Sequence, residues 1–329
     1  MKALVTGGGG FLGSAIVRQL LERGDEVEIL ARSSYPELEA LGVKCHQLDI
    51  TEEEGLVDAC EGKDVVFHVA ALAGVWGAWE RYYAVNVNGT KNMLAAARAA
   101  GVSRFIHTSS PSAVWSGVDQ VAVREEDCPY PTQFLAHYPE TKALSEQLAL
   151  AENSDDFQVC ALRPRLIWGP GDPHLIPRLL ERRARLKIVG DGENLVGLCY
   201  IENAAYAHVL AAEALGLEAA NAGKAYFITD DEPVKVWAWL NEVFVALGHP
   251  PITKKLPIAL VARIGGLMEL LWKILPLRGE PLMTRFAARS LAGTTYYDLT
   301  NARSDFGYRQ LVLPETGFEK MIDYFKGLE

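Results

Sequence analysis

Residues 2–13 read KALVTGGGGFLG, and residues 14–21 continue as SAIVRQLL. An apolar run leads into four glycines, and these lead into a segment with apolar residues at helical spacing, which predicts strand, loop and helix. Two glycine registers fit a phosphate-binding loop, Gly8-x-Gly10-x-x-Gly13 and Gly7-x-x-Gly10-x-x-Gly13. Glycine permits the tight turn and a close approach to a pyrophosphate, which the free N–H groups of the helix N-terminus then face. The sequence therefore predicts a dinucleotide site with the contact residues Gly7, Gly10, Phe11, Leu12 and Gly13.

The composition narrows the class of partner. The chain has 329 residues, of which 49% are hydrophobic and 22% charged, and its formal net charge is −10. This balance argues against nucleic acid as a ligand, because nucleic-acid binding needs a concentrated basic face. Five cysteines without a Cys-x-x-Cys pair are typical of reduced thiols, and the seven histidines show no metal-ligand spacing. Because the first strand follows Met1 directly, we expect no signal peptide and a cytoplasmic protein.

Further strands follow at the spacing of an α/β protein. Apolar runs at residues 26–30, 43–50, 64–71 and 104–108 alternate with helical patterns at 52–60 and 86–100. Such alternation predicts a parallel sheet with helices on both faces, the doubly wound Rossmann architecture. We expect residues 1–165 to form this dinucleotide-binding domain, with 199–232 returning to it. Residues 166–198 and 233–329 are expected to form a smaller, mostly helical substrate-binding domain at the C-terminal end.

The ends of the strands predict which cofactor binds. NAD-selective domains carry an acidic residue at the end of the second strand, where it accepts hydrogen bonds from ribose hydroxyls. Here Ala31 holds that place and Arg32 follows. A guanidinium pairs with a 2′-phosphate, so NADP is favoured, whereas a solvated arginine leaves NAD open. The other residues expected beside the cofactor are Asp49, for which a helix N-cap is the alternative, Ile50, Ala70 and Ala71.

A third group of residues predicts the chemistry. Ser109 and Ser110 follow the strand at 104–108, at the sheet edge where doubly wound proteins bind ligands. Tyr138 and Lys142 are four residues apart and therefore share one face of a helix. An ammonium held near a phenol lowers the pKa of the phenol toward neutrality, so that the phenol can exchange a proton with a substrate. We expect Ser110, with Ser109 as the alternative, Tyr138 and Lys142 to be catalytic.

Taken in order, these motifs resemble the extended branch of the short-chain dehydrogenase/reductase superfamily, in particular its 3β-hydroxysteroid dehydrogenase-like group. The matching residues are Thr6-Gly7-x-x-Gly10-x-x-Gly13, Asn86 with Gly89-Thr90, Thr108-Ser109-Ser110, Tyr138-x-x-x-Lys142, Leu162-Arg163-Pro164, Cys199-Tyr200-Ile201-Glu202-Asn203 and Asn301-Ala302-Arg303. The resemblance implies that Tyr138 is the general acid/base, that Lys142 binds the nicotinamide ribose, and that Ser110 bonds the substrate oxygen. It also implies that Pro164 and the residues up to Ile167 line the nicotinamide.

The segment 256–275 is the most apolar of the chain and indicates an apolar keto or hydroxy substrate. Arg263, Glu269 and Lys273 interrupt it on one side of a helix, so we expect no membrane span. A substrate wall, peripheral lipid contact, a core helix and a dimer contact all stay open. A carboxylated substrate would also need a cation, for which Arg165 and the arginines at 178–185 are candidates.

The expected activity is the reversible, NADP-dependent reduction of a keto group, and the resemblance implies a long-chain 2-alkyl-3-oxoalkanoate as substrate. It further implies a homodimer through helices at 92–100 and 142–152. The alternatives are an NAD-dependent nucleotide-sugar epimerase or dehydratase, a hydroxysteroid dehydrogenase, and a non-catalytic nucleotide-sensing protein on the same fold.

Overall fold

The computed structural model describes residues 1–173, 175–216, 219–275, 277 and 279–328. At its centre lies a seven-stranded sheet in the order β12-β7-β5-β4-β1-β2-β3, and all its neighbouring strands are parallel. The strands of this sheet are β1 (Lys2–Thr6), β2 (Glu26–Ala31), β3 (Lys44–Gln47), β4 (Val65–His68), β5 (Arg104–Thr108), β7 (Gln158–Pro164) and β12 (Lys224–Ile228). The doubly wound parallel sheet predicted from the sequence is confirmed.

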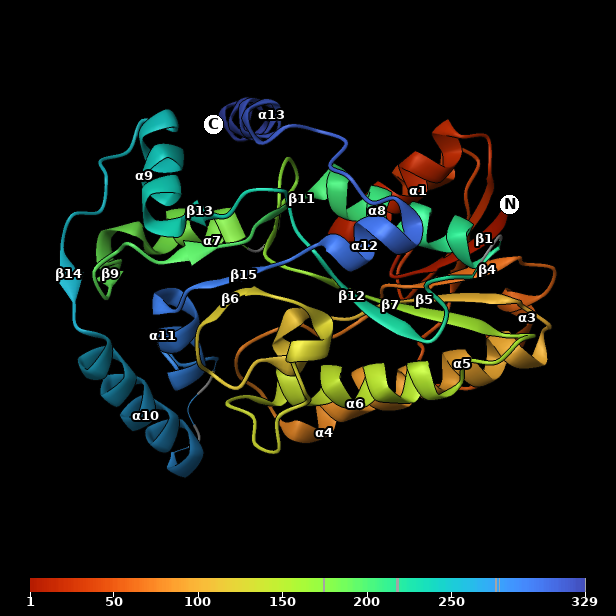
Figure 1. Ribbon diagram of the computed structural model, residues 1–329, viewed down its shortest axis with the longest axis horizontal. Helices are drawn as coiled ribbons and strands as arrows, with labels where there is room; N and C mark the ends of the chain where they lie inside the picture. Colours follow the sequence, from red (N-terminus) through yellow and green to blue (C-terminus); the bar gives the residue numbers. More distant parts are fainter. Residues whose placement is uncertain (174, 217–218, 276, 278, 329) are drawn as a thin grey trace.

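Helices cover both faces of this sheet (Figure 1). On one face, α1 (Phe11–Glu22) packs against α8 (Ile201–Leu215), and on the other α5 (Gly89–Ala99) packs against α3 (Leu56–Cys60) and α6 (His137–Ala151). With both faces covered, the central strands are buried, as in β4, where all four residues are buried and only the last, His68, is polar.

Two helix boundaries differ from the sequence expectation. The helix expected at 52–60 begins at Leu56, because Gly55 precedes it in the left-handed conformation, with φ of 78°. The sequence predicts a helix that begins at Asn86, but the helical segment begins earlier, with α4 (Trp79–Tyr82). It continues through a π-helical turn at Tyr83–Asn88 into α5. Asn86 thus lies inside a helical segment, in a kind of turn that often marks functional sites.

The small sheets lie beyond the carboxyl ends of the strands of the central sheet, whereas α12 (Thr300–Phe306) packs against β12 and α8. A four-stranded sheet in the order β13-β10-β15-β6 forms a second layer there, and β8 pairs with β11 and β9 with β14. These strands are β6 (Gln120–Val123), β8 (Ile167–Trp168), β9 (Ile188–Val189), β10 (Leu195–Val196), β11 (Cys199–Tyr200), β13 (Val234–Lys235), β14 (Lys255–Leu256) and β15 (Thr295–Tyr297). The other α-helices are α2 (Pro36–Glu39), α7 (Leu175–Arg182), α9 (Val236–Ala246), α10 (Ile258–Ile274), α11 (Arg285–Ala292), α12 (Thr300–Phe306) and α13 (Pro314–Lys326).

Candidate active site

The glycine loop joins β1 to α1 in a conformation that requires glycine. Gly7 has φ of 66°, and a Cβ placed on Gly13 would collide with the carbonyl oxygen of Gly7. Gly10 caps α1 without any side-chain hydrogen bond, and the first turn of the helix carries no acidic residue. The N-terminus of α1 therefore keeps its partial positive charge available to an anion. This backbone cradle fits the diphosphate of a dinucleotide.

The residues predicted beside the loop differ in their surroundings. Ala70 lies directly against Gly7, and its N–H donates to Thr6 Oγ1 at 3.1 Å, whereas Ala71 is exposed. Leu12 is buried in the core and Phe11 is partly buried. Because its side chain lies in the core, Leu12 can contact a cofactor only through its backbone.

Arg32, Asp49 and Ile50 lie at the carboxyl ends of β2 and β3. The Arg32 side chain is exposed and directly follows β2. Asp49 Oδ1 accepts hydrogen bonds at 2.9 Å from both the N–H and the hydroxyl of Thr51. It closes a local turn, so the alternative of an N-cap for the next helix is wrong, since that helix begins at Leu56. Ile50 is buried against α5, where a Cβ on Gly89 would clash with it.

The three residues predicted to be catalytic gather at the carboxyl end of β5. Tyr138 lies in the first turn of α6, near enough to Ser110 for that hydroxyl to act on the pKa of the phenol. The Ser110 hydroxyl also accepts a hydrogen bond from the Ser112 N–H at 3.2 Å and lies 2.8 Å from Ser112 Oγ. Lys142 follows one turn later, with 3% of its surface exposed, and donates to the Thr108 carbonyl at 2.5 Å. The hydroxyl of Ser109, in contrast, is buried beside the Glu146 carboxylate. The geometry thus pairs Ser110, rather than Ser109, with Tyr138.

Burial dominates the ionisation of this group. It raises the pKa of Tyr138 above its usual value, whereas the nearby Ser110 hydroxyl acts to lower it. Burial also lowers the pKa of Lys142 to about 8, although the Glu146 carboxylate opposes that shift. Since Lys142 donates to a backbone carbonyl, the expected lowering of the tyrosine pKa by the ammonium remains a prediction for the complex with a cofactor.

Behind the catalytic helix lies a buried ion pair that the sequence reasoning missed. Glu146, fully buried on α6, accepts two hydrogen bonds from the Arg163 guanidinium, at 2.6 and 2.9 Å, and one from Tyr130 Oη at 2.6 Å. Burial would raise the pKa of Glu146, but Arg163, Ser109 and Tyr130 hold it below its usual value. The positions 138, 142 and 146 recur every four residues, so a search for polar residues on the face of Tyr138 could have found Glu146.

Asn86 makes a second connection that fixes the site. Its side-chain oxygen accepts from the Leu72 N–H at 2.7 Å, and its Nδ2 donates to the Leu72 carbonyl and to Thr141 Oγ1, both at 3.0 Å. These bonds tie the loop after β4 to the catalytic helix, between Tyr138 and Lys142 in sequence. Asn86 therefore acts as a positioning residue for α6.

The carboxyl end of β7 borders the same edge. Pro164 is buried, Ile167 is partly buried, and Leu166 between them has φ of 38°, in the left-handed region that residues with side chains rarely adopt. The register pairs Thr108 of β5 with Leu162 of β7, so Pro164 lies beside Ser110 when that register is continued. Pro164 and Ile167 are thus placed next to the predicted catalytic residues.

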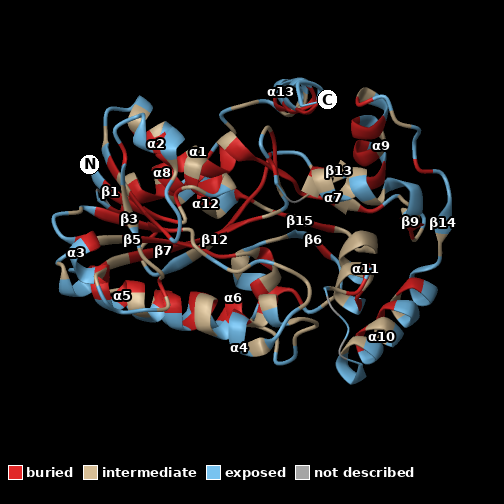
Figure 2. Cartoon of the chain, turned by 180° about the vertical axis from the view of Figure 1, so that it is seen from behind, coloured by how far each residue is buried: buried red, intermediate tan, exposed pale blue. Residues whose placement is uncertain are grey.

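The apolar segment 256–275 forms α10, whose packing contradicts a core helix. Val261, Gly265 and Glu269 face inward, and Glu269 accepts hydrogen bonds from the backbone and side chain of Arg285. The opposite side of α10 is exposed (Figure 2). The large aliphatic residues exposed there are Ile258, Leu260, Ile264, Leu267, Leu270, Leu271 and Ile274. The helix thus packs through a narrow side that includes Val261, Gly265 and Glu269 and leaves most of its leucines exposed.

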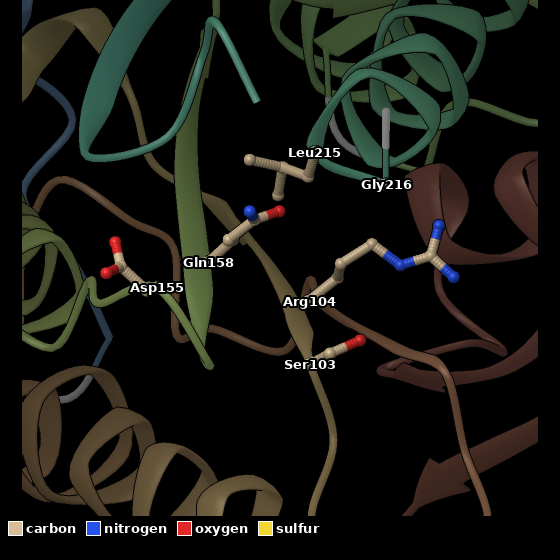
Figure 3. A pocket seen from close by; sticks show the side chains of 6 residues that line it. All are labelled: Ser103, Arg104, Asp155, Gln158, Leu215 and Gly216. Carbon is tan, nitrogen blue, oxygen red and sulfur yellow. The ribbon is translucent and has the colours of Figure 1, made fainter. Parts of the chain in front are cut away.

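Other features of the described residues add no competing site. A shallow hollow lies at the amino ends of β5 and β7, the opposite edge from Ser110, and is lined by Ser103, Arg104, Asp155, Gln158, Leu215 and Gly216 (Figure 3). Within the described ranges, no group of three or more histidine, cysteine, aspartate or glutamate side chains could hold a metal ion. The same part of the chain contains no helix long and apolar enough to cross a bilayer.

Comparison with known proteins identifies the family. A family model described as "3-beta hydroxysteroid dehydrogenase/isomerase family" matches residues 4–258. The chain is 46% identical, over 98% of both sequences, to a 2-alkyl-3-oxoalkanoate reductase of Stenotrophomonas maltophilia. It is 36% identical to the decarboxylating sterol-4-alpha-carboxylate 3-dehydrogenase of Mus musculus, over 99% of this chain and 91% of the mouse protein.

A solved structure shows the same architecture over the full length. MoeE5 in complex with UDP-glucuronic acid and NAD superposes with a TM-score of 0.77 and 26% identity, and each chain is covered completely. Together with the sheet topology and the match to the family model, this similarity supports the resemblance seen in the motifs. The chain therefore belongs to the 3-beta hydroxysteroid dehydrogenase/isomerase family and is an NAD(P)-dependent oxidoreductase.

Proposed function

We propose that this chain catalyses the reversible, NADP-dependent reduction of the keto group of a long-chain 2-alkyl-3-oxoalkanoate to the 3-hydroxy acid. The observation that carries the proposal is that Ser110, Tyr138 and the buried Lys142 come together at the carboxyl end of β5. The bacterial relative at 46% identity, which is named for this reaction, supports the choice of substrate.

The chain's own residues would divide the work as follows. Ser110 and Tyr138 hydrogen-bond the substrate oxygen, and Tyr138 donates the proton that makes it a hydroxyl. Lys142 holds the ribose of the cofactor, and its positive charge favours transfer of that proton. The nicotinamide, when bound, supplies a hydride to the carbonyl carbon. The glycine loop holds the diphosphate, with Pro164 and Ile167 beside the nicotinamide ring.

The preference for NADP rests on Arg32. This exposed arginine follows β2 directly, in the place where NAD-selective domains use an acid, and it can pair with a 2′-phosphate. We expect Arg32→Ala to raise the KM for NADPH at least about 10-fold, the scale of a lost charged hydrogen bond, and to leave the KM for NADH unchanged. Equal effects on both cofactors would contradict this role.

A spectrophotometric screen tests the activity itself. Reduced nicotinamide is followed with NADPH or NADH against a freshly prepared long-chain 2-alkyl-3-oxo acid, a ketosteroid and UDP-glucuronic acid. We expect NADPH and the keto acid to give the fastest turnover. Turnover of the ketosteroid alone would favour a hydroxysteroid dehydrogenase. Conversion of the UDP-sugar with tightly held NAD would favour the epimerase alternative, which the similarity to MoeE5 keeps in view.

The substrate's alkyl chains would be held by the expected substrate-binding domain, residues 166–198 and 233–329. The exposed aliphatic side of α10 supports, in addition, a peripheral contact with lipid. Exposed basic residues lie before it, on it and on the neighbouring α11, namely Lys254, Lys255, Arg263, Lys273 and Arg289, in a chain whose net charge is −10. A helix with an aliphatic face and a basic fringe binds an anionic bilayer surface.

A homodimer through α5 and α6 remains a prediction of the family resemblance. Leu144 and Leu148 on α6 are 36% and 37% exposed, as expected of residues that a partner covers. Sedimentation equilibrium of the wild type and of a Leu144→Glu, Leu148→Glu variant tests it. The wild type should be a dimer and the variant a monomer, whereas a monomeric wild type would overturn the prediction.

A further inference from the structure

Two arginines at the carboxyl end of β7 have different environments. Arg163 lies in β7 and Arg165 directly follows it, and the charges of both side chains act to lower the pKa of the nearby Tyr297. Arg163 is almost fully buried and forms a two-pronged ion pair with Glu146. Arg165 has a buried Nε with no hydrogen-bond partner among the described residues.

Arg165 also has no carboxylate within ion-pair distance in the described part of the chain; the ion pairs of its strand involve only Arg163. The other arginines that are candidates for a substrate anion differ in this respect. Arg178 and Arg182 both pair with Glu280, and Arg183 and Arg185 are exposed. A guanidinium nitrogen that is both buried and unpaired is costly, and an anion that reached it would offset that cost.

The place of Arg165 in the fold is next to the reacting groups. The Ser109 N–H donates to the Leu162 carbonyl at 2.6 Å, which holds the ends of β5 and β7 side by side. Arg165 directly follows β7 and therefore lies at the same edge of the sheet as Ser109 and Ser110. Its own N–H donates to the Ile228 carbonyl, and the left-handed Leu166 turns the chain immediately after it.

This position separates Arg165 from the phosphates of a dinucleotide. In the sheet, β7 is the third strand away from β1, whose end carries the glycine loop. Three strand spacings amount to roughly 14 Å, too far for a side chain on β7 to share the diphosphate. A nearer anion is needed, on the side of the site where the substrate oxygen meets Ser110 and Tyr138.

We propose that Arg165 binds the carboxylate of the substrate and so selects 3-oxo and 3-hydroxy acids over the corresponding esters and ketones. The inference rests on the proposed function. In such an acid, one carbon separates the carboxylate from the carbonyl carbon, so the carboxylate stays close to Ser110 and Tyr138 and calls for a cation at the same edge of the sheet. The planar guanidinium can donate two parallel hydrogen bonds to a carboxylate. An ester carries no negative charge, so the same guanidinium would bind it more weakly.

The experiment compares a long-chain 2-alkyl-3-hydroxy acid with its methyl ester, oxidised with NADP by the full-length protein. The variants are Arg165→Met, Arg165→Lys and the control Arg309→Gln, which changes an exposed arginine far along the chain. We expect Arg165→Met to lower kcat/KM for the acid about 10- to 100-fold, the scale of lost charged hydrogen bonds, and to change that for the ester less than about 3-fold. Arg165→Lys should recover part of the activity on the acid, and Arg309→Gln should match the wild type.

Equal losses on acid and ester in Arg165→Met would overturn the role, since they would indicate a general disturbance of the site. Unchanged activity on the acid would overturn it as well. Calorimetric binding of the acid and the ester supplies a readout that does not need turnover. If the wild type oxidises neither compound but binds the acid more tightly, and Arg165→Met loses that preference, the proposed function fails while the role of Arg165 stands. A wild type that binds both equally contradicts the role itself.

Discussion

The carboxyl edge of the sheet and the helix α10 both depart from the usual pattern of burial. Charged side chains are buried at the sheet edge, and aliphatic side chains are exposed on α10. At the sheet edge, Lys142, Glu146 and Arg163 are charged and less than 5% exposed. On α10, Leu267 and Ile274 are 59% and 69% exposed although they belong to the most apolar segment of the chain. Folding alone favours neither arrangement, because buried charges must be paired and exposed leucines gain nothing. Each region therefore points to something other than stability: the first to proton transfer and positioning, the second to a surface that the chain alone does not cover.

The largest effect is expected from removing Tyr138, the proposed general acid at the sheet edge. Tyr138→Phe keeps the ring and its packing but deletes the hydroxyl near Ser110. We expect kcat to fall about 10²- to 10⁴-fold, the usual contribution of general acid catalysis, while the affinity for NADPH changes little. Turnover and cofactor fluorescence measure the two effects. Tyr324→Phe, on the exposed surface of α13, is the matched control, and unchanged kcat in Tyr138→Phe would remove the tyrosine from the mechanism.

Much of this edge could be predicted from the sequence because its elements are local. The glycine run, the serine pair after a strand and the four-residue spacing of Tyr138 and Lys142 each lie within one turn or one strand end. The Arg163–Glu146 pair and the unpaired Arg165 could not be predicted, since they depend on how β7 and α6 face each other. The exposure of α10 could not be predicted either, because the sequence pattern of an apolar helix is the same whether its apolar side is covered by its own chain or by a partner.

The second prediction concerns the buried ion pair. Glu146→Leu would leave the Arg163 guanidinium buried without its partner, and we expect it to lower the free energy of unfolding by about 3–5 kcal/mol. Glu152→Leu is the matched control, because Glu152 pairs with Arg98 at the surface, where such a pair contributes less than about 1 kcal/mol. Urea unfolding at neutral pH compares the two variants. Similar small losses in both would show that the pair at the sheet edge is no more important than one in water.

The third prediction follows from the pKa of Lys142, which burial lowers to about 8 in the folded chain, from about 10.4 in an unfolded one. Between these values the unfolded state binds more protons, so this group makes stability rise with pH from about 8 to about 10.4. Below pH 8 the folded chain carries the full cost of the buried ammonium, up to about 3 kcal/mol. Lys142→Met should therefore unfold at a higher urea concentration than the wild type at pH 7, and this advantage should shrink by pH 10. An advantage that is constant with pH would show that the ammonium is not destabilised in the folded chain.

The smallest expected change in stability belongs to α10. Leu267→Ser should change the free energy of unfolding by less than about 0.5 kcal/mol, because the side chain is already in contact with water. Val261→Ala, on the packed side of the same helix, is 5% exposed and should cost about 1–3 kcal/mol. Urea unfolding of both variants gives the comparison. A large loss in Leu267→Ser would mean that this side of α10 is covered in solution, for example by a second copy of the chain.

The substitution Leu267→Ser also tests whether the exposed aliphatic side of α10 contacts lipid or a protein partner. If the aliphatic side rests on a bilayer, the wild type should sediment with vesicles of phosphatidylglycerol and phosphatidylcholine, and less with phosphatidylcholine alone, because the flanking lysines and arginines favour anionic lipid. Leu267→Ser combined with Leu271→Ser should weaken this binding while leaving the activity on a water-soluble short-chain substrate intact. Such a result would show that the exposed leucines of α10 serve to bind a membrane surface and are not needed for the reaction at the sheet edge. Equal sedimentation of wild type and variant would instead leave the leucines without a role at a membrane, and a concentration-dependent dimer lost in the same variant would give the surface to a second copy.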